Sequence, residues 1–149
     1  MTSGQPDHEV VHRHLAALRE ALRHLRKHGV RSADELRTDA DLRWIVERGL
    51  QLCVQNALDI ATHLSAASRM DTPDYATAID RLAELAVVPA DFALRLRRIA
   101  GFRNVLVHGY LQVDLRIVEG VLGSGLQDLE LFGQHVERYL SKKQPTGNP

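Results

Sequence analysis

One line of apolar residues in the middle of the chain recurs without interruption at alternating spacings of four and three. Its members are Val46, Leu50, Cys53, Ala57, Ile60, Leu64 and Ala67. Because this alternation follows the period of an α-helix, it predicts one long helix from about Thr38, its candidate N-cap, to about Ala67. A second apolar line on the same segment consists of Trp44, Val54, Leu58 and Ala61. Two lines predict burial on more than one side, either as the central rod of a bundle or at a subunit interface.

Capping signals predict where several other helices begin and end. Asp7 is a suitable N-cap for a first helix, and Gly29 is typical of its C-terminus. Ser32, followed three residues later by Glu35, resembles the capping box of a short helical turn. Thr72–Pro73 predicts a cap followed by proline at the first position of a further helix.

The chain after Val88–Pro89 is predicted to form two more helices. The first runs into residues 101–110, and Asp114 is the candidate cap of the second. Four glycines in this last helix indicate close helix packing or a bend: Gly120, Gly123, Gly125 and Gly133. Since no run alternates like a strand, the predicted fold class is all-α, a single up-and-down bundle of about five helices over residues 7–140. Residues 1–6 and 141–149 are predicted to be flexible tails.

Composition excludes several classes of protein. With 19 Lys+Arg against 19 Asp+Glu, the chain is no polycation, although a local basic patch stays open. The single cysteine, Cys53, excludes an internal disulfide and a multi-cysteine zinc site, and its place on the apolar line predicts inert packing. No apolar run approaches the ~20 residues of a membrane helix, and the N-terminus lacks a signal-peptide pattern. We therefore expect a cytoplasmic protein without membrane contact.

Two histidine pairs raise the question of a metal site. His8 and His12 are four residues apart, as are His24 and His28, and such pairs can share a helix face and bind zinc. No HExxH motif accompanies them, and arginines are mixed among them. A solvated helix face is therefore the preferred interpretation, and neither a metal nor another cofactor is expected.

The segment 95–110 carries polar groups suited to phosphodiester chemistry. Four arginines lie within nine residues without an intervening acid: Arg95, Arg97, Arg98 and Arg103. His108 follows Arg103 by five positions, and Tyr110 follows by two more. Arginine binds a phosphate through two parallel hydrogen bonds, and histidine exchanges a proton near neutral pH. The first three arginines are either an ordinary solvated helix face or an RNA contact.

This segment offers a single histidine, His108, whereas metal-free cleavage of RNA needs two proton-exchanging groups. One acts as base on the 2′-hydroxyl and the other as acid on the leaving oxygen, while a cation stabilises the developing charge. A twofold dimer would supply the second histidine, because a twofold interface repeats the same patch. The chemistry therefore predicts a homodimer.

RNVLVHGY at 103–110 resembles the signature of the HepT-like toxins, in which Arg, four residues, His, one residue and Tyr follow one another. These toxins belong to the HEPN superfamily of helical ribonucleases. The segment 44–64 resembles the family's second long helix, and the stretch from Thr72 to Arg98 also fits. The resemblance covers roughly residues 7–140 and implies a HEPN-like helical bundle that dimerises around the motif.

The resemblance also implies a function. It is that of a toxin in a type II/VII-like toxin–antitoxin pair, acting as a metal-independent endoribonuclease. Arg103 and His108 match the family's ribonuclease residues, and Asn104 is expected to assist by hydrogen bonding. Tyr110 matches the tyrosine to which the cognate antitoxin, an MntA-like minimal nucleotidyltransferase, adds AMP to silence the toxin.

Asp59 and Arg98 are candidate supporting residues. Asp59 would orient or charge-pair with Arg103 or His108, and Arg98 would contact RNA. Two other interpretations of the motif stay open. In one, the chain is a non-catalytic docking partner of the nucleotidyltransferase, and Tyr110 is only a nucleotide acceptor. In the other, Arg103 and His108 serve only a dimer interface.

Overall fold

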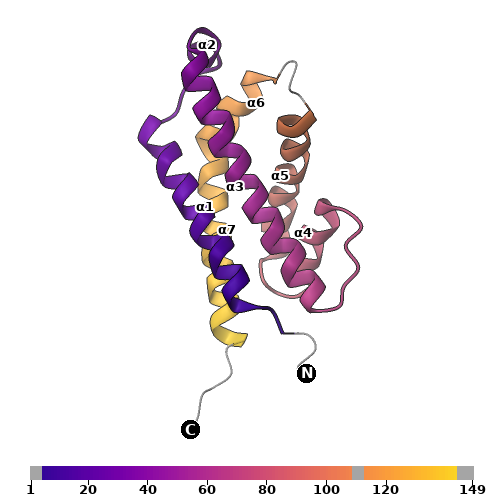
Figure 1. The fold of residues 1–149 in the computed structure, drawn as a ribbon. Coiled ribbons are helices and arrows are strands. Elements are labelled where there is room, and N and C mark those ends of the chain that lie inside the picture. Colours follow the sequence, from indigo (N-terminus) through magenta and orange to yellow (C-terminus); the bar gives the residue numbers. More distant parts are fainter. Residues whose placement is uncertain (1–4, 109–112, 144–149) are drawn as a thin grey trace.

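The computed structural model describes residues 5–108 and 113–143, and all regular structure within these ranges is helical. The elements in chain order are α1 (His8–His28), α2 (Ala33–Thr38), α3 (Ala40–Ala67), α4 (Tyr75–Glu84), α5 (Ala90–His108), α6 (Leu115–Gly120), the π-helical turn η1 (Val121–Gly125) and α7 (Leu126–Lys143). The predicted all-α class is confirmed. Because α6, η1 and α7 follow one another without a break, they form one rod, which completes the bundle with α1, α3, α4 and α5 (Figure 1). No helix in these ranges has the length and apolarity needed to cross a membrane.

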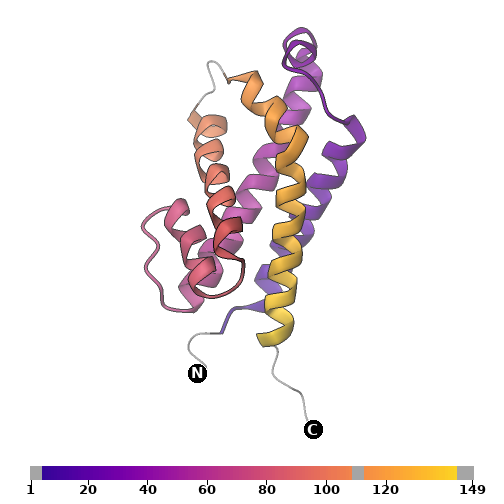
Figure 2. The same cartoon turned by 180° about the vertical axis from the view of Figure 1, so that it is seen from behind.

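α3 is the central rod of this bundle. It contacts α1, α2, α4, α5 and α7. Figure 1 shows α1 along one side of α3, with α5 and the shorter α4 along the other. Figure 2, from behind, shows the rod of α6, η1 and α7 running between α1 and α5. The long helix predicted from the apolar lines is thus surrounded by its neighbours.

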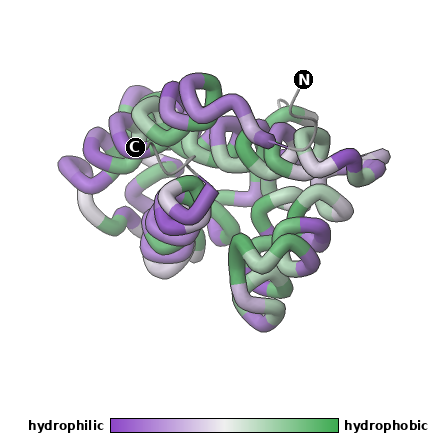
Figure 3. Tube along the Cα trace, turned by 90° about the horizontal axis from the view of Figure 1, so that it is seen from below, coloured by the Kyte–Doolittle hydropathy of each residue, from purple (hydrophilic) through white to green (hydrophobic). Residues whose placement is uncertain are grey.

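Both apolar lines of α3 are buried over most of their length. The buried members are Val46, Leu50, Cys53, Val54, Ala57, Leu58, Ile60, Ala61 and Leu64. Seen along the bundle in Figure 3, hydrophobic and hydrophilic stretches alternate, as expected when one face of each helix packs inward. Trp44 was expected on the second line but is 74% exposed. It lies two residues before the fully buried Val46, and residues two apart project about 200° apart on a helix.

Several of the predicted capping positions are confirmed. Asp7 and Asp114 accept hydrogen bonds from backbone N–H groups in the first turns of α1 and α6. Ser32 and Glu35 form the reciprocal capping box at the start of α2. Gly29 ends α1 with a φ of 70°, a conformation that favours glycine. The local sequence therefore supplies the side-chain caps of these helix ends.

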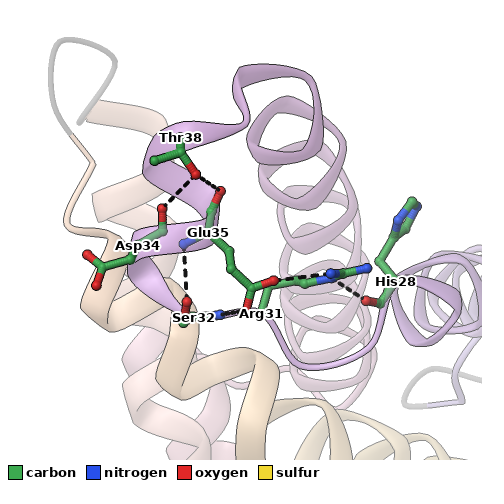
Figure 4. A network of polar contacts seen from close by, with 6 residues as sticks. All are labelled: His28, Arg31, Ser32, Asp34, Glu35 and Thr38. Carbon is green, nitrogen blue, oxygen red and sulfur yellow. Dashed lines mark hydrogen bonds and ion pairs between the residues drawn. The ribbon is translucent and has the colours of Figure 1, made fainter.

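A polar network joins the end of α1 to α2 (Figure 4). Arg31 donates from Nε to the carbonyl of His28 at 2.7 Å and from Nη1 to the carboxylate of Glu35 at 3.1 Å. The hydrogen bond from Arg31 holds the pKa of the Glu35 carboxyl below its usual range. At the other end of α2, the hydroxyl of Thr38 donates to the carbonyls of Asp34 and Glu35.

Two predicted helix starts are wrong by one or two positions. α3 is capped by Asp39 rather than Thr38, and the Asp39 carboxylate accepts from a backbone N–H of its first turn at 3.0 Å. α4 is capped by Asp74 rather than Thr72–Pro73, with the corresponding hydrogen bond at 2.7 Å. In both cases an aspartate directly follows the predicted cap segment. Its negative charge adds a favourable interaction with the helix N-terminus.

The glycines of the last rod only partly behave as predicted. A Cβ at Gly120 or Gly123 would meet nothing within 4 Å, so these two do not mark close helix packing. Gly133 is buried, and a Cβ there would lie 3.7 Å from Leu15 on α1. The π-helical turn η1 interrupts the rod where Gly123 and Gly125 lie. α7 continues to Lys143, beyond residue 140 where the domain was predicted to end.

Gly49 lies where α1 and α3 approach each other closely. A Cβ there would come 2.6 Å from Cδ2 of Leu25, which is itself buried. Gly49→Ala is therefore expected to lower the free energy of unfolding by about 1–3 kcal/mol through overpacking. Gly101→Ala on α5 is the matched control, because its Cβ would meet nothing within 4 Å. It should instead gain up to ~1 kcal/mol from helix propensity. Urea denaturation followed by circular dichroism measures both, and equal effects would contradict the tight α1–α3 contact.

Candidate active site

Arg103 lies on α5 and is held by residues of α3 and α4. Its Nε donates to Oε1 of Gln55 on α3 at 3.4 Å. Its guanidinium carbon lies 5.1 Å from the ring centroid of Tyr75, the first residue of α4, which is a cation–π contact. Three helices therefore meet at one half-buried guanidinium.

Gln55 is the centre of the polar contacts around this arginine. While its Oε1 accepts from Arg103, its Nε2 donates to Oδ1 of Asp59 at 2.8 Å and to the hydroxyl of Tyr75 at 3.3 Å. Gln55 and Asp59 are one helical turn apart and share a face of α3. The supporting role of Asp59 stays a prediction, and its carboxylate reaches Arg103 through the amide of Gln55 rather than by the expected charge pair.

No carboxylate of the described residues neutralises the charge of Arg103. Within residues 5–108 and 113–143, no carboxylate forms an ion pair with it. The hydrogen bond to Gln55 uses Nε, and among the described residues no side chain accepts from the Nη1 and Nη2 groups, which leaves them for another acceptor. A guanidinium presented in this way can bind two oxygens of a phosphate in parallel.

The remaining residues of the predicted motif lie at the end of the described segment or beyond it. His108 is the last residue of α5, and Tyr110 lies outside the described residues. Five helical residues separate the backbone positions of Arg103 and His108, which places them about 140° apart around the axis of α5. One α5 helix therefore does not place both positions on one face. Asn104, next to Arg103, is exposed.

The predicted arginine group on α5 divides into two kinds. Arg95 forms an ion pair with Asp128 of α7 at 3.4 Å, and Arg97 pairs with Asp80 of α4 at 3.5 Å. These two arginines therefore join helices, which favours the ordinary structural interpretation for them. Arg98 is exposed, and no carboxylate of the described residues forms an ion pair with it.

Two of the histidines of α1 contact polar side chains outside the predicted histidine pairs. His14 Nδ1 lies 2.9 Å from Oδ1 of Asn56 on α3, and His24 contacts Glu20 at 2.9 Å. The rings of His8 and His12 are 6.3 Å apart between centroids. In the part of the chain that the structure describes, no three His, Cys, Asp or Glu side chains are placed to hold a metal ion.

Gln55 and Tyr75 are the site residues that sequence reasoning missed. In the sequence, Tyr75 lies four residues before Ile79 and so belongs by spacing to an apolar helix stripe, while Gln55 lies on neither apolar line of the central segment. A usable signal was present, since Gln55 precedes Asp59 by four residues and so shares its helix face. Because both residues are far from Arg103 in the sequence, no local pattern predicted their contact with it.

Comparison with known proteins points to one family. The profile of the family described as Ribonuclease HepT-like matches residues 9–136. The chain is 28% identical over 143 residues to a protein of Aphanizomenon flos-aquae named tRNA nuclease HepT, covering 94% of this chain and 95% of that protein. A Shewanella oneidensis protein named mRNA nuclease HepT is 28% identical over 99 residues, covering 66% of this chain and 74% of that protein.

Solved structures share the fold. A Shewanella oneidensis HEPN toxin, tri-AMPylated and in complex with MNT antitoxin, superimposes with a TM-score of 0.77 at 22% identity, covering 89% of this chain and 99% of that one. YutE, a cytosolic Bacillus subtilis protein of unknown function, gives a TM-score of 0.82 at 17% identity, covering 95% and 96%. At these identities the likeness concerns the fold alone, and it confirms the predicted HEPN-like bundle.

Gln55→Leu is expected to release the Arg103 side chain, because it removes the acceptor of Nε and the donor to Asp59. The Nε–H signal of Arg103 in nitrogen-15 NMR spectra is assigned by its disappearance in Arg103→Lys. In Gln55→Leu this signal should lose its protection from solvent exchange. Gln51→Leu is the matched control, since Gln51 lies one turn away on the same helix and bonds to Arg48 instead. Unchanged protection in Gln55→Leu would remove Gln55 from the positioning of Arg103.

Cys53 is expected to be chemically inert in the folded protein. Burial raises the pKa of its thiol to about 12, so the reactive thiolate is a trace species at pH 8. Ellman's reagent at pH 8 should therefore label no thiol in native protein and one per chain in guanidinium. Rapid labelling of the native protein would contradict both the burial and the raised pKa.

Proposed function

Because the chain belongs to the HepT-like ribonuclease family, we propose that it is the cytoplasmic toxin of a toxin–antitoxin pair and cleaves RNA without a metal ion. The observation that carries the proposal is the Arg103 guanidinium, which Gln55 and Tyr75 hold while leaving its Nη groups for a phosphate. The relatives named as mRNA and tRNA nucleases support RNA as the substrate class.

In the proposed reaction, RNA supplies its own nucleophile. One His108 imidazole takes the proton of a 2′-hydroxyl, whose oxygen forms a bond to the adjacent phosphorus. The bond from phosphorus to the 5′-oxygen breaks, and a second His108, protonated, donates its proton to that oxygen. The products are a 2′,3′-cyclic phosphate and a 5′-hydroxyl. Arg103 stabilises the negative charge that grows on the phosphate oxygens, and Asn104 assists by hydrogen bonding.

This reaction requires two copies of the chain. A single protomer carries one His108, and helical geometry sets its backbone position about 140° around α5 from that of Arg103. A twofold axis beside the C-terminal part of α5 would bring the arginine of one protomer and the histidine of its partner to one phosphate. We therefore propose a homodimer whose two motifs form the site.

Silencing is proposed to occur at Tyr110, two positions after His108. A cognate MntA-like nucleotidyltransferase would transfer AMP from ATP to its hydroxyl, which forms the oxygen–phosphorus bond and releases pyrophosphate. The support is the Shewanella oneidensis HEPN toxin, which is tri-AMPylated and bound to an MNT antitoxin. Added AMP brings negative charge and volume to the motif segment, and both oppose the entry of RNA.

His108→Ala is expected to abolish RNA cleavage by the purified, unmodified protein, because no other group in the site would exchange the proton. The helical circular-dichroism spectrum and the dimer should persist. Arg103→Lys should retain a fraction of the activity, since lysine keeps the charge but loses the paired hydrogen bonds. His12→Ala, at an exposed position on α1, is the control and should cleave at the wild-type rate.

Each contrary result favours a different alternative. Retained cleavage by His108→Ala would remove this residue from the mechanism. Absence of cleavage by the wild-type protein made without its partner would favour the non-catalytic docking protein. Loss of the dimer in both the Arg103 and His108 variants, measured by sedimentation, would favour a purely interfacial role.

A further inference from the structure

Trp44 is the only tryptophan of the chain, and 74% of it is exposed on α3. It borders a hollow of about 190 Å³ between α3 and α5, lined by Trp44, Glu47, Arg48, Gln51 and Leu106. A large apolar ring is usually buried, and its exposure beside a hollow is typical of a binding site. No part of the proposed reaction uses this hollow.

The other side chains of the hollow are mainly polar. Arg48 donates from Nη1 to Oε1 of Gln51 at 3.2 Å, which leaves the amide nitrogen of Gln51 and the remaining Arg48 donors for a ligand. Burial raises the pKa of the Glu47 carboxyl, although Arg43 opposes the shift. The hollow thus combines an aromatic face with a planar cation, an amide and a carboxyl group. These are the groups that stack on nucleobases and hydrogen-bond to their edges.

The hollow lies on the same seam between α3 and α5 as Arg103. Leu106, which lines it, follows Arg103 by three residues on α5. On α3, Gln51 lies one turn before Gln55, the acceptor of the Arg103 hydrogen bond. Trp44 is about 16 Å from Gln55 along the axis of α3, at 1.5 Å per residue. A nucleic-acid strand with a phosphate at Arg103 can therefore extend along the seam into the hollow.

We propose that this hollow binds a nucleobase of single-stranded RNA, with the base stacked on the indole of Trp44 and its polar edge on Gln51 and Arg48. The identity of the strand rests on the proposed function. A base paired inside a duplex cannot present its face to the indole, so this site selects unpaired RNA a few nucleotides from the cleaved phosphate.

A second copy of this chain is the main competing occupant. The cores of protein–protein interfaces are depleted in glutamate, whereas Glu47 lines this hollow. Aromatic stacking combined with a guanidinium is instead the usual composition of a platform for single-stranded nucleic acid. The carboxyl group of Glu47 therefore favours a nucleobase over the apolar centre of a dimer contact.

A non-cleavable probe tests the site apart from catalysis. Single-stranded hexamers of 2′-O-methyl RNA cannot be cut, because their 2′-oxygens are blocked. They should quench the fluorescence of Trp44 saturably, whereas an abasic hexamer with the same phosphates should not. Fluorescence anisotropy of a labelled hexamer should show about 5- to 100-fold weaker binding to Trp44→Leu, and partial recovery in Trp44→Phe. Leu94→Gln, at an exposed apolar position on α5 outside the hollow, should bind like the wild type.

Several results would overturn the proposal. These are equal quenching by the abasic hexamer, unchanged affinity in Trp44→Leu, or dissociation of the dimer in that variant, which would assign Trp44 to the subunit contact. The two proposals fail separately. If the hexamer quenches Trp44 but the wild-type protein cleaves no RNA, the proposed ribonuclease activity is wrong and the proposed base-binding site stands. If Trp44→Leu cleaves RNA with an unchanged KM and an unchanged base preference, the proposed base-binding site is wrong and the proposed ribonuclease activity stands.

Discussion

Burial of α3 on more than one side is the constraint around which this molecule is organised. Its apolar lines cannot be covered by a single neighbour, so α1, α4, α5 and α7 all pack against it. Part of what stays accessible on α3 is a strip at the seam with α5. That strip carries Trp44, Arg48, Gln51, Gln55 and Asp59. The packing requirement therefore also decides where polar chemistry can lie.

The environment of Arg103 follows from that strip. A half-buried guanidinium needs hydrogen-bonding partners. A carboxylate in direct contact would neutralise its positive charge and so weaken the binding of an anionic ligand. Here the contacts are a neutral amide and an aromatic ring, from Gln55 and Tyr75, while Asp59 is held one step away by Gln55. The arginine is oriented and keeps its charge for a ligand, which is the arrangement expected of an anion-binding group.

The end of the bundle around α2 is braced by local and distant contacts together. Arg31, Ser32 and Glu35 connect α1 to α2 through hydrogen bonds of neighbouring residues. A carboxylate oxygen of Glu119 on α6 accepts from the backbone N–H of Ala33 and so joins α2 to the helix that follows the motif segment. Both α2 and α6 are thereby held at the end of the bundle where α5 terminates (Figure 1).

The amino-acid sequence by itself determined the helical class, the central helix and several caps, because periodicity and capping act over a few residues. Asp7, Ser32 with Glu35, and Asp114 were identified for this reason, while Thr38 and Thr72–Pro73 failed because a neighbouring aspartate is the better cap. Arg103 stood out through its motif, which is a local pattern as well.

Only the tertiary structure decided which residues surround that arginine and where the tryptophan points. Gln55, Tyr75 and Arg103 lie on three helices and are far apart in sequence, so no local pattern reports their contact. Trp44 belongs to an apolar line by spacing, yet it is exposed because the packing of Val46 sets the rotation of α3 about its axis. Such rotations are chosen by the neighbouring helices, whose positions the sequence of one helix does not contain.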